Sequence, residues 1–382
     1  MTQSSMSGSG KIKVLIVFGT RPEAIKLFPL VHALEPDERF DVRICVTAQH
    51  RAMLDQVLSL ANITPHHDLD LMMPNQTLDT LTAKALTGIG AVLDEEKPDW
   101  IVVQGDTTTA MTGALAAYYR QIRVCHVEAG LRSGDLYRPW PEEANRKIIG
   151  SFAALHCAPT QTAADALRAE NINPETIFVT GNTVVDALEW VTAEIAQRPS
   201  LVHDLAGLAQ KFAQRKIIAI TTHRRENFGE GMAAIASAVK RIAIRDDVAF
   251  IFPIHMNPNV RQVMEAQLQG MDNVAIIEPL DYLHFAHLLG IAHIILTDSG
   301  GVQEEAPTLG KPVLVMRTTT ERPEGIEAGT ALLVGTDADE IVEQVEKLLD
   351  SPEDYRRMSK AHNPFGDGKA AQRICDLLAS SR

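Results

Sequence analysis

Short apolar runs that recur along the chain, each followed by a turn and a helical pattern, constrain the fold most. In the first half these runs are KVLIVF (13–18), VRICVT (42–47), DWIVVQ (99–104), RVCHVE (123–128) and ALHCAP (154–159). In the second half they are KIIAITT (216–222), FIFPIH (250–255), VAIIEP (274–279), HIILTD (293–298) and PVLVMR (312–317). Strands buried on both faces of a parallel sheet have this nearly continuous apolar character. The alternation of such runs with helical stretches predicts an α/β fold with doubly wound parallel sheets.

The two sets of runs indicate two domains, since each set opens with a basic strand, a charged turn (GTRPE, THRREN) and a helix. A length of 382 residues agrees with two to three domains of about 150 residues. The simplest interpretation is two Rossmann-like domains facing each other across a cleft. We expect a flexible tail over 1–10, an N-terminal domain over 11–181 and a C-terminal domain over 182–365. A C-terminal helix within 366–382 would pack back on the N-terminal domain.

Composition excludes several classes of function. Hydrophobic residues make up 45% of the chain and the net charge is −13, which argues against a general binder of nucleic acids or anionic membranes. The four cysteines are widely spaced, as in reduced cytoplasmic proteins: Cys45, Cys125, Cys157 and Cys375. No apolar run approaches the roughly 20 residues that span a bilayer, and the start, MTQSSMSGSG, lacks an apolar signal segment. A cytoplasmic location is therefore expected.

Residues 127–147, VEAGLRSGDLYRPWPEEANRK, carry four acids and four bases on a segment that its glycines and prolines keep largely out of regular helix. Charges of this density form either a solvated surface or a site. The acids include Glu128 and Glu142, and the bases include Arg132 and Arg146.

The segment TDSGGVQEEAPTLGKP (297–312) reads as a strand end, a glycine turn and a short helix. Glycines at a helix start let a ligand approach backbone amides that favour phosphate, which makes Ser299, Gly300 and Gly301 candidates. Glu305, one turn further on, is placed to accept hydrogen bonds from ribose hydroxyls. The alternative is a plain strand–turn–helix junction.

Other charged residues also follow predicted strands, where ligands bind in open α/β sheets. In GTRPEAIK (19–26) and QGDTTTAM (104–111) they are Arg21, Lys26 and Asp106, and both segments are equally compatible with capped helices. In the second half they are His223, Arg224, His255 and Arg322.

Several well-defined motifs are absent from the sequence. No GxGxxG opens a βα unit, and no GxxxxGK[ST], HExxH or GxSxG occurs. A nicotinamide cofactor, a P-loop nucleotide site and a zinc site of the HExxH type are therefore not predicted, and no metal-ligand spacing is visible among the histidines.

With these residues in view, the chain resembles the non-hydrolysing UDP-N-acetylglucosamine 2-epimerases from about Lys11 to its C-terminal helix. The segments that carry the resemblance, in order, are FGTRPEAIK, VTAQHR, GDTTT, HVEAGLR, PWPEEANR, TGNTVVDAL, THRRENFG, HMNPNVR, DSGGVQEEAP, TERPEGIEAGT and NPFGDG.

The resemblance implies a two-domain fold of the glycosyltransferase-B type that binds a UDP-sugar in the interdomain cleft. The implied reaction interconverts UDP-GlcNAc and UDP-ManNAc through anti elimination of UDP, a 2-acetamidoglucal intermediate and re-addition, without a cofactor. Elimination gives a route to an sp² C2 where no nicotinamide is available for transient oxidation. The implied partners are UDP-GlcNAc, UDP-ManNAc, UDP and a second copy in a homodimer, and the product would serve cell-surface polysaccharide.

The same resemblance implies roles for single residues. Asp106, Glu128, Glu142 and His223 match the catalytic positions, but which acid serves which face of C2 stays open. Substrate contacts are implied for Arg21, Lys26, Arg146, His255, Ser299, Gly300, Gly301, Glu305 and Arg322. Arg132 and Arg146 could instead orient the acids or have a structural role. Under this interpretation the charged loop is a site.

Two features depart from the family pattern. Gln104 precedes GDTTT where His is usual, and Arg138 precedes PWPEEANR where a small residue is common. Some members bind a second UDP-GlcNAc as an activator, for which Gln49, His50 and Arg224 are candidates here. Ala52 and Asn75 are small or neutral at neighbouring positions, so activation stays open.

Four rival functions remain compatible with the sequence. They are a glycosyltransferase of the same fold, a hydrolysing epimerase that releases free ManNAc, an epimerase acting on a diacetamido uronic acid, and a catalytically silent nucleotide-sugar sensor. The retained acids Asp106, Glu128 and Glu142 favour the non-hydrolysing epimerase.

Overall fold

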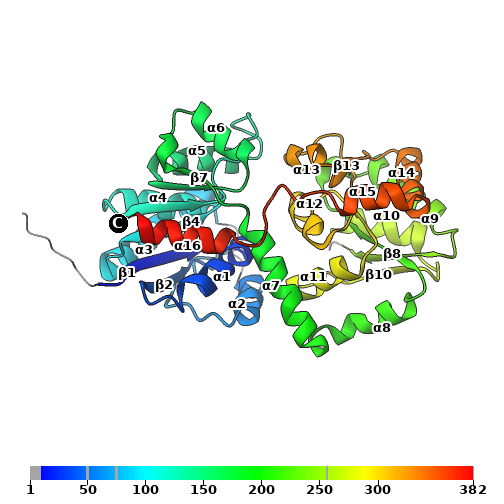
Figure 1. Cartoon of the computed structure of the whole chain (residues 1–382), viewed down its shortest axis with the longest axis horizontal. Coiled ribbons are helices and arrows are strands. Elements are labelled where there is room, and N and C mark those ends of the chain that lie inside the picture. The colour runs from blue at the N-terminus through cyan, green and yellow to red at the C-terminus, as the bar shows by residue number, and fades with distance from the viewer. Residues whose placement is uncertain (1–9, 49–50, 74–75, 255–256, 382) are drawn as a thin grey trace, which may run out of the picture. The chain divides into compact units, whose positions relative to one another are not determined.

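The computed structural model describes residues 10–48, 51–73, 76–254 and 257–381. The chain forms two compact units (Figure 1). Unit 1 consists of the residues up to Ala187 together with those from Gly368 onward, and unit 2 of Leu188–Asp367. Each unit is built on one parallel sheet, which confirms the predicted α/β fold with two doubly wound sheets.

The sheet of unit 1 has the strand order β3-β2-β1-β4-β5-β6-β7, and all neighbouring strands are parallel. Its strands are β1 (Ile12–Phe18), β2 (Phe40–Val46), β3 (His67–Asp68), β4 (Trp100–Gln104), β5 (Arg123–Val127), β6 (Leu155–Ala158) and β7 (Ile177–Val179). All five predicted strands of this half are confirmed. Strands β3 and β7 were not predicted, because two or three residues are too few to show a periodic pattern.

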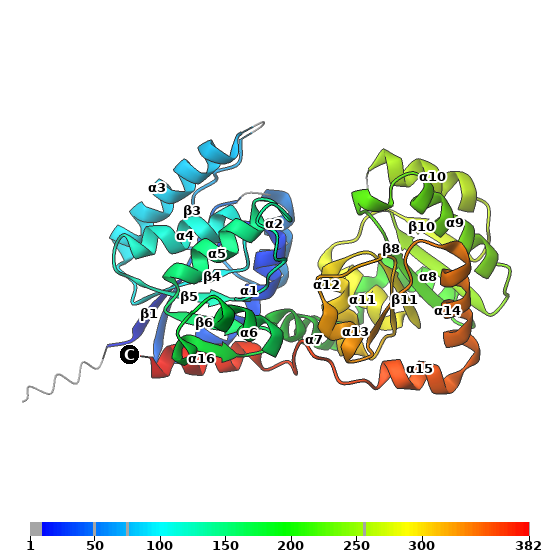
Figure 2. The same cartoon turned by 90° about the horizontal axis from the view of Figure 1, so that it is seen from above.

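Helices cover this sheet on both faces (Figure 2). They are α1 (Arg21–Leu34), α2 (Arg51–Leu60), α3 (Leu78–Glu96), α4 (Thr108–Tyr118), α5 (Glu142–Phe152), α6 (Gln161–Ala169) and α16 (Ala370–Ser380), with a 3₁₀ turn η1 (Pro174–Thr176). Helix α16, from the C-terminal end of the chain, packs beside α1. The helix α7 (Thr183–Gln197) contains the boundary between the units.

Unit 2 repeats the topology with the strand order β10-β9-β8-β11-β12-β13, again all parallel. Its strands are β8 (Lys216–Thr221), β9 (Val248–Pro253), β10 (Val274–Ile277), β11 (Ile294–Thr297), β12 (Val313–Val315) and β13 (Ala331–Leu333). The five predicted strands are confirmed, and the short β13 was not predicted.

The helices of unit 2 are α8 (His203–Lys211), α9 (Glu230–Ile242), α10 (Pro258–Leu268), α11 (Tyr282–Ile291), α12 (Gly300–Glu305), α13 (Pro323–Glu327), α14 (Ala338–Asp350) and α15 (Pro352–Ser359). Short 3₁₀ turns are η2 (Pro199–Val202), η3 (Arg225–Asn227) and η4 (Ala306–Leu309). Among all described helices, none combines the length and the apolar character needed to cross a lipid bilayer.

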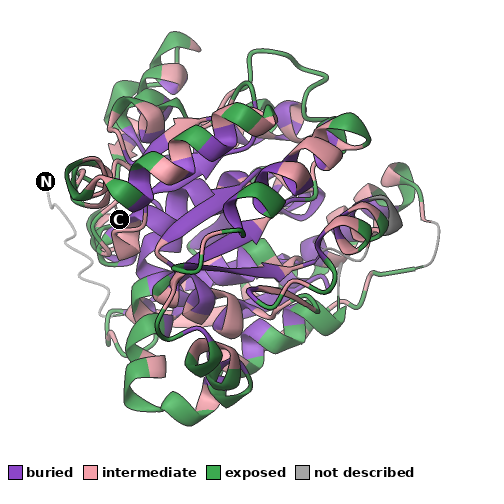
Figure 3. Cartoon of the chain, turned by 90° about the vertical axis from the view of Figure 1, so that its right-hand side faces the viewer, coloured by how far each residue is buried: buried purple, intermediate pink, exposed green. Residues whose placement is uncertain are grey.

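Alternate strand residues supply two cores, one on each face of the sheet. On β8, Ile218 and Ile220 pack with α9, α10 and α14, whereas Ile217 and Ala219 pack with α11 and the η4 region. Successive side chains of a strand point to opposite faces, so a strand covered on both sides must be apolar throughout. Figure 3 shows the central strands buried and the outer helix faces exposed.

Strand order reverses at the same place in both sheets, between β1 and β4 in unit 1 and between β8 and β11 in unit 2. Open α/β sheets bind ligands beyond the carboxyl ends of the strands at this reversal. The loops that follow these four strands therefore mark the candidate site in each unit.

Candidate functional site

In unit 1 the Glu128 carboxylate is held by three donors from three separate elements. Lys26 of α1 and Gln104 at the end of β4 contact its two oxygens, and Asn182 Nδ2 lies 3.2 Å from Oε1. Glu128 and its ion-pair partner Lys26 are largely buried. Burying a charged group is costly unless it is paired and hydrogen-bonded, and these three contacts offset that cost for Glu128.

Glu128 also has a left-handed backbone, with a φ of +63°. This conformation costs a non-glycine residue roughly 1–2 kcal/mol, and such residues concentrate at functional sites. The turn that follows β5 thus holds Glu128 at an energetic cost, which favours a role for its side chain.

Asp106 follows β4 and forms an ion pair with Arg146 of α5. Arg146 Nη2 and Nε lie 2.6 Å and 2.8 Å from Oδ2 of Asp106. The neighbouring Asn145 donates to the Asp106 carbonyl at 2.8 Å. Helix α5 therefore fixes both the side chain and the backbone of Asp106. Arg146 accordingly orients an acid, one of the two roles that the sequence left open.

The two glutamates that begin α5 have different surroundings. Glu143 is fully buried, and its Oε2 accepts from Ser133 N at 3.1 Å and from Arg146 Nη1 at 3.0 Å. Glu142 Oε2 is buried and has no hydrogen-bond partner among the residues that the structure describes. Each glutamate thus has one buried oxygen without a partner among the described residues, Oε1 in Glu143 and Oε2 in Glu142, but Glu143 also fixes the loop through its other oxygen.

Arg132 has a different environment from Arg146. Its Nε and Nη2 donate to Glu170 at 3.0 Å and 2.7 Å, and Lys147 contacts the same carboxylate. The hydrogen bond from Arg132 lowers the pKa of Glu170 to about 2. A two-pronged arginine–carboxylate pair is rigid, so Arg132 ties the loop to the end of α6. Its role is structural.

Gly19, which directly follows β1, packs too closely against its neighbours to accept a side chain. A Cβ on Gly19 would lie 2.0 Å from Thr47 Oγ1 and 2.7 Å from Thr109 Oγ1. These two hydroxyls are hydrogen-bonded at 2.8 Å. Arg21 follows at the first turn of α1 and has no hydrogen-bonding or ionic partner within the described part of the chain.

In unit 2 the buried Asp298 organises the segment that follows β8. Its carboxylate accepts from Thr222 Oγ1 at 2.8 Å, His223 N at 3.0 Å, Arg224 N at 2.9 Å and Asn227 Nδ2 at 3.1 Å. His223 Nδ1 lies 3.4 Å from Oδ1 of the same residue, and the imidazole is partly exposed. Asp298 thus fixes the backbone of His223 and Arg224 and leaves the His223 ring accessible.

Ser299, Gly300 and Gly301 follow β11 and begin α12, whose N-cap Ser299 makes no side-chain capping bond. Within the described part of the chain, a Cβ on Gly300 would meet only Arg224 Nη2, at 3.9 Å, so there is room beside this backbone although Gly300 itself is buried. Arg224 Nε is buried without a hydrogen-bond partner among the described residues. Open amides beside a guanidinium suit a phosphate group.

Arg322 and Glu305, two further residues of unit 2 that were predicted to contact the substrate, interact with other residues of the protein. Arg322 Nε contacts the buried Glu304, so the charge of Arg322 is largely offset within the protein. Glu305 is buried and lies near Tyr282, where burial and the Glu305 charge raise the pKa of the phenol. Arg317, which the sequence did not single out, joins Glu226 and Glu321 at 2.6 Å each and anchors two loops.

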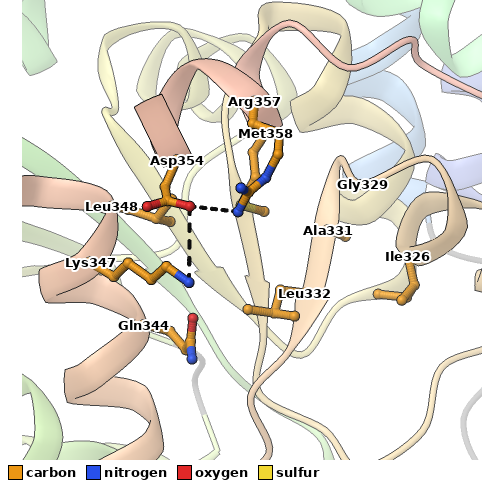
Figure 4. A pocket seen from close by; sticks show the side chains of 10 residues that line it. All are labelled: Ile326, Gly329, Ala331, Leu332, Gln344, Lys347, Leu348, Asp354, Arg357 and Met358. Carbon is orange, nitrogen blue, oxygen red and sulfur yellow. Dashed lines mark hydrogen bonds and ion pairs between the residues drawn. The ribbon is translucent and has the colours of Figure 1, made fainter. Parts of the chain in front are cut away.

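Three predicted residues, Gln49, His50 and His255, lie outside the described residues. A separate pocket of about 360 Å³ lies between β13, α13, α14 and α15 (Figure 4). Its charged groups are Lys347, Asp354 and Arg357, and Arg357 Nη2 lies 2.6 Å from the Asp354 carboxylate. No predicted site residue is among the described residues that line this pocket.

Sequence reasoning missed three polar residues of unit 1: Gln104 and Asn182, which contact Glu128, and Glu23, which contacts Thr107 next to Asp106. Gln104 ends a predicted strand and was noted only as a departure from the family pattern. Asn182 lies in TGNTVVDAL, 54 residues from Glu128. Glu23 is a first-turn glutamate of a predicted helix, which usually indicates only a helix cap. Nothing in the sequence pairs these residues with their partners.

Each unit is a Rossmann-like domain with polar residues near the place where its strand order reverses. A protein with two such domains belongs to the doubly wound α/β class, and glycosyltransferase-B folds are composed of domains of this kind. The family model described as UDP-N-acetylglucosamine 2-epimerase matches residues 32–379. The chain belongs to this family.

The similarity extends over almost the whole chain. A UDP-N-acetylglucosamine 2-epimerase from Yersinia pestis is 54% identical over 372 residues, covering 96% of this chain and 98% of the relative. That of Escherichia coli (strain K12) is 52% identical over 373 residues, covering 97% and 99%. The UDP-GlcNAc 2-epimerase of Neisseria meningitidis bound to UDP-GlcNAc superimposes with a TM-score of 0.88 at 45% identity, covering 96% and 99%. That of Methanocaldococcus jannaschii in complex with UDP-GlcNAc and UDP gives a TM-score of 0.78 at 38% identity, with the same coverage.

Proposed function

We propose that this chain is a non-hydrolysing epimerase that interconverts UDP-GlcNAc and UDP-ManNAc at C2. The observation that carries the proposal is the set of three carboxyl groups, Asp106, Glu128 and Glu142, at one switch point of a family member. Relatives more than 50% identical are UDP-N-acetylglucosamine 2-epimerases, and a structural neighbour holds UDP-GlcNAc.

The reaction begins when a base removes the C2 proton and the C1–O bond to UDP breaks. The electron pair of the C2–H bond forms the C1–C2 double bond of a 2-acetamidoglucal, and the departing diphosphate takes the C1–O pair. UDP then adds back at C1 while a proton enters C2 from the opposite face. Two proton-transfer groups and a site for the diphosphate are required.

The environments of the three acids support a division of roles. Asp106 is paired with Arg146, and Glu128 with Lys26, so each carboxyl group is held beside a cation, which suits the acceptor of a proton. Glu142 has a buried carboxylate oxygen without a partner among the described residues. We propose that Glu142 donates the proton that is returned to C2, and that Asp106 or Glu128 accepts the proton that is removed.

Unit 2 would bind the departing UDP. The amides of Gly300 and Gly301 and the adjacent Arg224 favour the diphosphate, and Glu305 the ribose, whereas the Ser299 amide donates to Thr297 Oγ1 at 3.0 Å. The arrangement around Gly300 therefore favours a substrate role for Arg224 over the allosteric role considered from the sequence. His223, oriented by Asp298, is placed to donate to a phosphate oxygen.

We further propose that the enzyme needs no cofactor, acts in the cytoplasm as a homodimer and supplies ManNAc-type sugars for cell-surface polysaccharide. Light scattering tests the dimer, and the polysaccharide composition of a deletion strain tests the pathway.

The reaction is tested by incubating the protein with UDP-GlcNAc in heavy water and following the sugar by proton NMR. UDP-ManNAc with deuterium at C2, formed without added NAD, is the expected result. Free ManNAc would instead indicate a hydrolysing epimerase. Tight UDP binding without turnover would favour a transferase or a sensor.

A further inference from the structure

Glu23 is a fully buried carboxylate at the start of α1 with four hydrogen-bond donors. Its Oε2 accepts from Gly19 N at 3.1 Å, Thr20 N at 2.8 Å and Thr20 Oγ1 at 2.7 Å. Its Oε1 accepts from Thr107 Oγ1 at 2.7 Å. The bond from Thr20 N, together with the bond from Glu23 N to Thr20 Oγ1 at 3.5 Å, forms the capping box of α1, for which Glu23 needs only one oxygen.

The fourth bond connects two elements that are distant in the chain. Thr107 lies 84 residues from Glu23 and is the N-cap of α4, where its hydroxyl oxygen accepts from Ala110 N at 3.0 Å. Glu23 therefore joins the first turn of α1 to the first turn of α4. Helix capping alone does not require this connection.

Residues of the proposed site flank both ends of this connection. Lys26, one turn after Glu23 on α1, contacts Glu128, and Asp106 immediately precedes Thr107. Burial raises the pKa of Glu23, so ionisation carries a desolvation cost that its four donors offset only in part. A buried, fully hydrogen-bonded carboxylate such as that of Glu23 fixes the positions of its partners more tightly than a solvent-exposed contact would.

We propose that Glu23 is a positioning residue that holds Asp106 in register with the Lys26–Glu128 pair through Thr107. The inference rests on the proposed epimerase function. Glu23 does not exchange protons with the substrate; it sets the position of a group that does. A displacement of about 1 Å in such a group lowers turnover by roughly 10²-fold.

The test compares Thr107→Val, which removes the bond to Glu23 and the cap of α4, with Thr107→Ser, which keeps the hydroxyl. Thr160→Val is the matched control, because Thr160 caps α6 of the same unit through Ala163 N. Both valine variants lose one cap, and Thr107→Val also leaves buried Glu23 without one donor, so its melting temperature should fall further than that of Thr160→Val. We expect Thr107→Val to lower kcat by about 10- to 100-fold with little change in KM, and Thr107→Ser to restore kcat.

The variant Glu23→Gln removes the charge while keeping the shape, and it should combine non-additively with Thr107→Val. Equal kcat values for Thr107→Val and Thr160→Val would overturn the positioning role, as would additive losses. Absence of turnover in the unaltered protein would contradict the epimerase function itself, so the two failures are distinguishable.

Discussion

Arg146 and Asp106, 40 residues apart in the sequence, form a two-pronged contact in which Nη2 and Nε lie 2.6 Å and 2.8 Å from one carboxylate oxygen. The third nitrogen of the same guanidinium, Nη1, lies 3.0 Å from buried Glu143. One arginine thus fixes an acid of the proposed site against the helix that carries Glu142.

Replacing Arg146 by Lys should lower kcat by about 10²-fold, because a lysine ammonium cannot reproduce the fork that orients Asp106. Steady-state kinetics with UDP-GlcNAc measures this change. Lys147→Ala is the control, since Lys147 is exposed and contacts Glu170 outside the site. Similar losses in both variants would contradict an orienting role for Arg146.

Substitutions of the two neighbouring glutamates of α5 should have different effects, one on the reaction and the other on the stability of the protein. Glu142→Gln should abolish deuterium incorporation at C2 while UDP still binds, because the amide cannot carry the returned proton. Glu143→Gln should mainly lower the melting temperature, since it weakens the contacts to Ser133 and Arg146. NMR in heavy water and calorimetry distinguish the two effects, and a fully active Glu142→Gln would refute our assignment.

Gln104→Glu should shift the pH dependence of turnover. A second carboxyl group against Glu128 cannot ionise freely, so the acidic limb of the kcat/KM profile should move to higher pH. Profiles from pH 5.5 to 9 measure the shift. The control is Gln104→His, which introduces the side chain usual in the family and should keep activity at neutral pH. An unchanged profile would mean that Gln104 does not influence Glu128.

His126 should make the stability of the protein depend on pH. Burial lowers its pKa to about 3, and its Nε2 lies 2.7 Å from the Gly105 carbonyl. Below the unfolded-state pKa of about 6.5 the unfolded chain binds a proton that the folded chain does not. Stability is therefore retained above pH 6.5 and falls as the pH decreases towards 3, by about 1.4 kcal/mol per pH unit from this residue.

His126→Gln keeps a donor for the Gly105 carbonyl and should remove this part of the slope. Urea unfolding at pH 7 and pH 5, followed by circular dichroism, compares the variant with the unaltered protein. His156 and His293, whose pKa values are also lowered by burial, retain their own contributions. Identical slopes for the two proteins would exclude the assignment to His126.

In unit 2, Asp298→Asn should weaken UDP binding by about tenfold or more. The amide replaces an acceptor that faces the N–H groups of His223 and Arg224, so the loop loses its fixed conformation. Calorimetric titration with UDP measures the loss. Asp337→Asn weakens the cap of α14 in the same unit and should leave UDP affinity unchanged.

The sequence by itself determined the ten longer or more apolar strands and the location of candidate residues at strand ends, but not the short strands β3, β7 and β13. Continuous apolar runs such as Lys13–Phe18 indicate strands covered on both faces, because adjacent side chains must both be buried. The glycine and proline signals around Glu128 and Ser299 likewise marked loops at the carboxyl ends of strands. These are local properties, which a few neighbouring residues encode.

Only the tertiary structure decided which side chains act together. Glu23 with Thr107, Gln104 with Glu128 and Asp106 with Arg146 are pairs separated by 84, 24 and 40 residues. Each pair meets because strands distant in the sequence become neighbours in the sheet, bringing the loops after them to one edge. Contacts of this kind depend on strand order and helix packing, which no short stretch of sequence specifies.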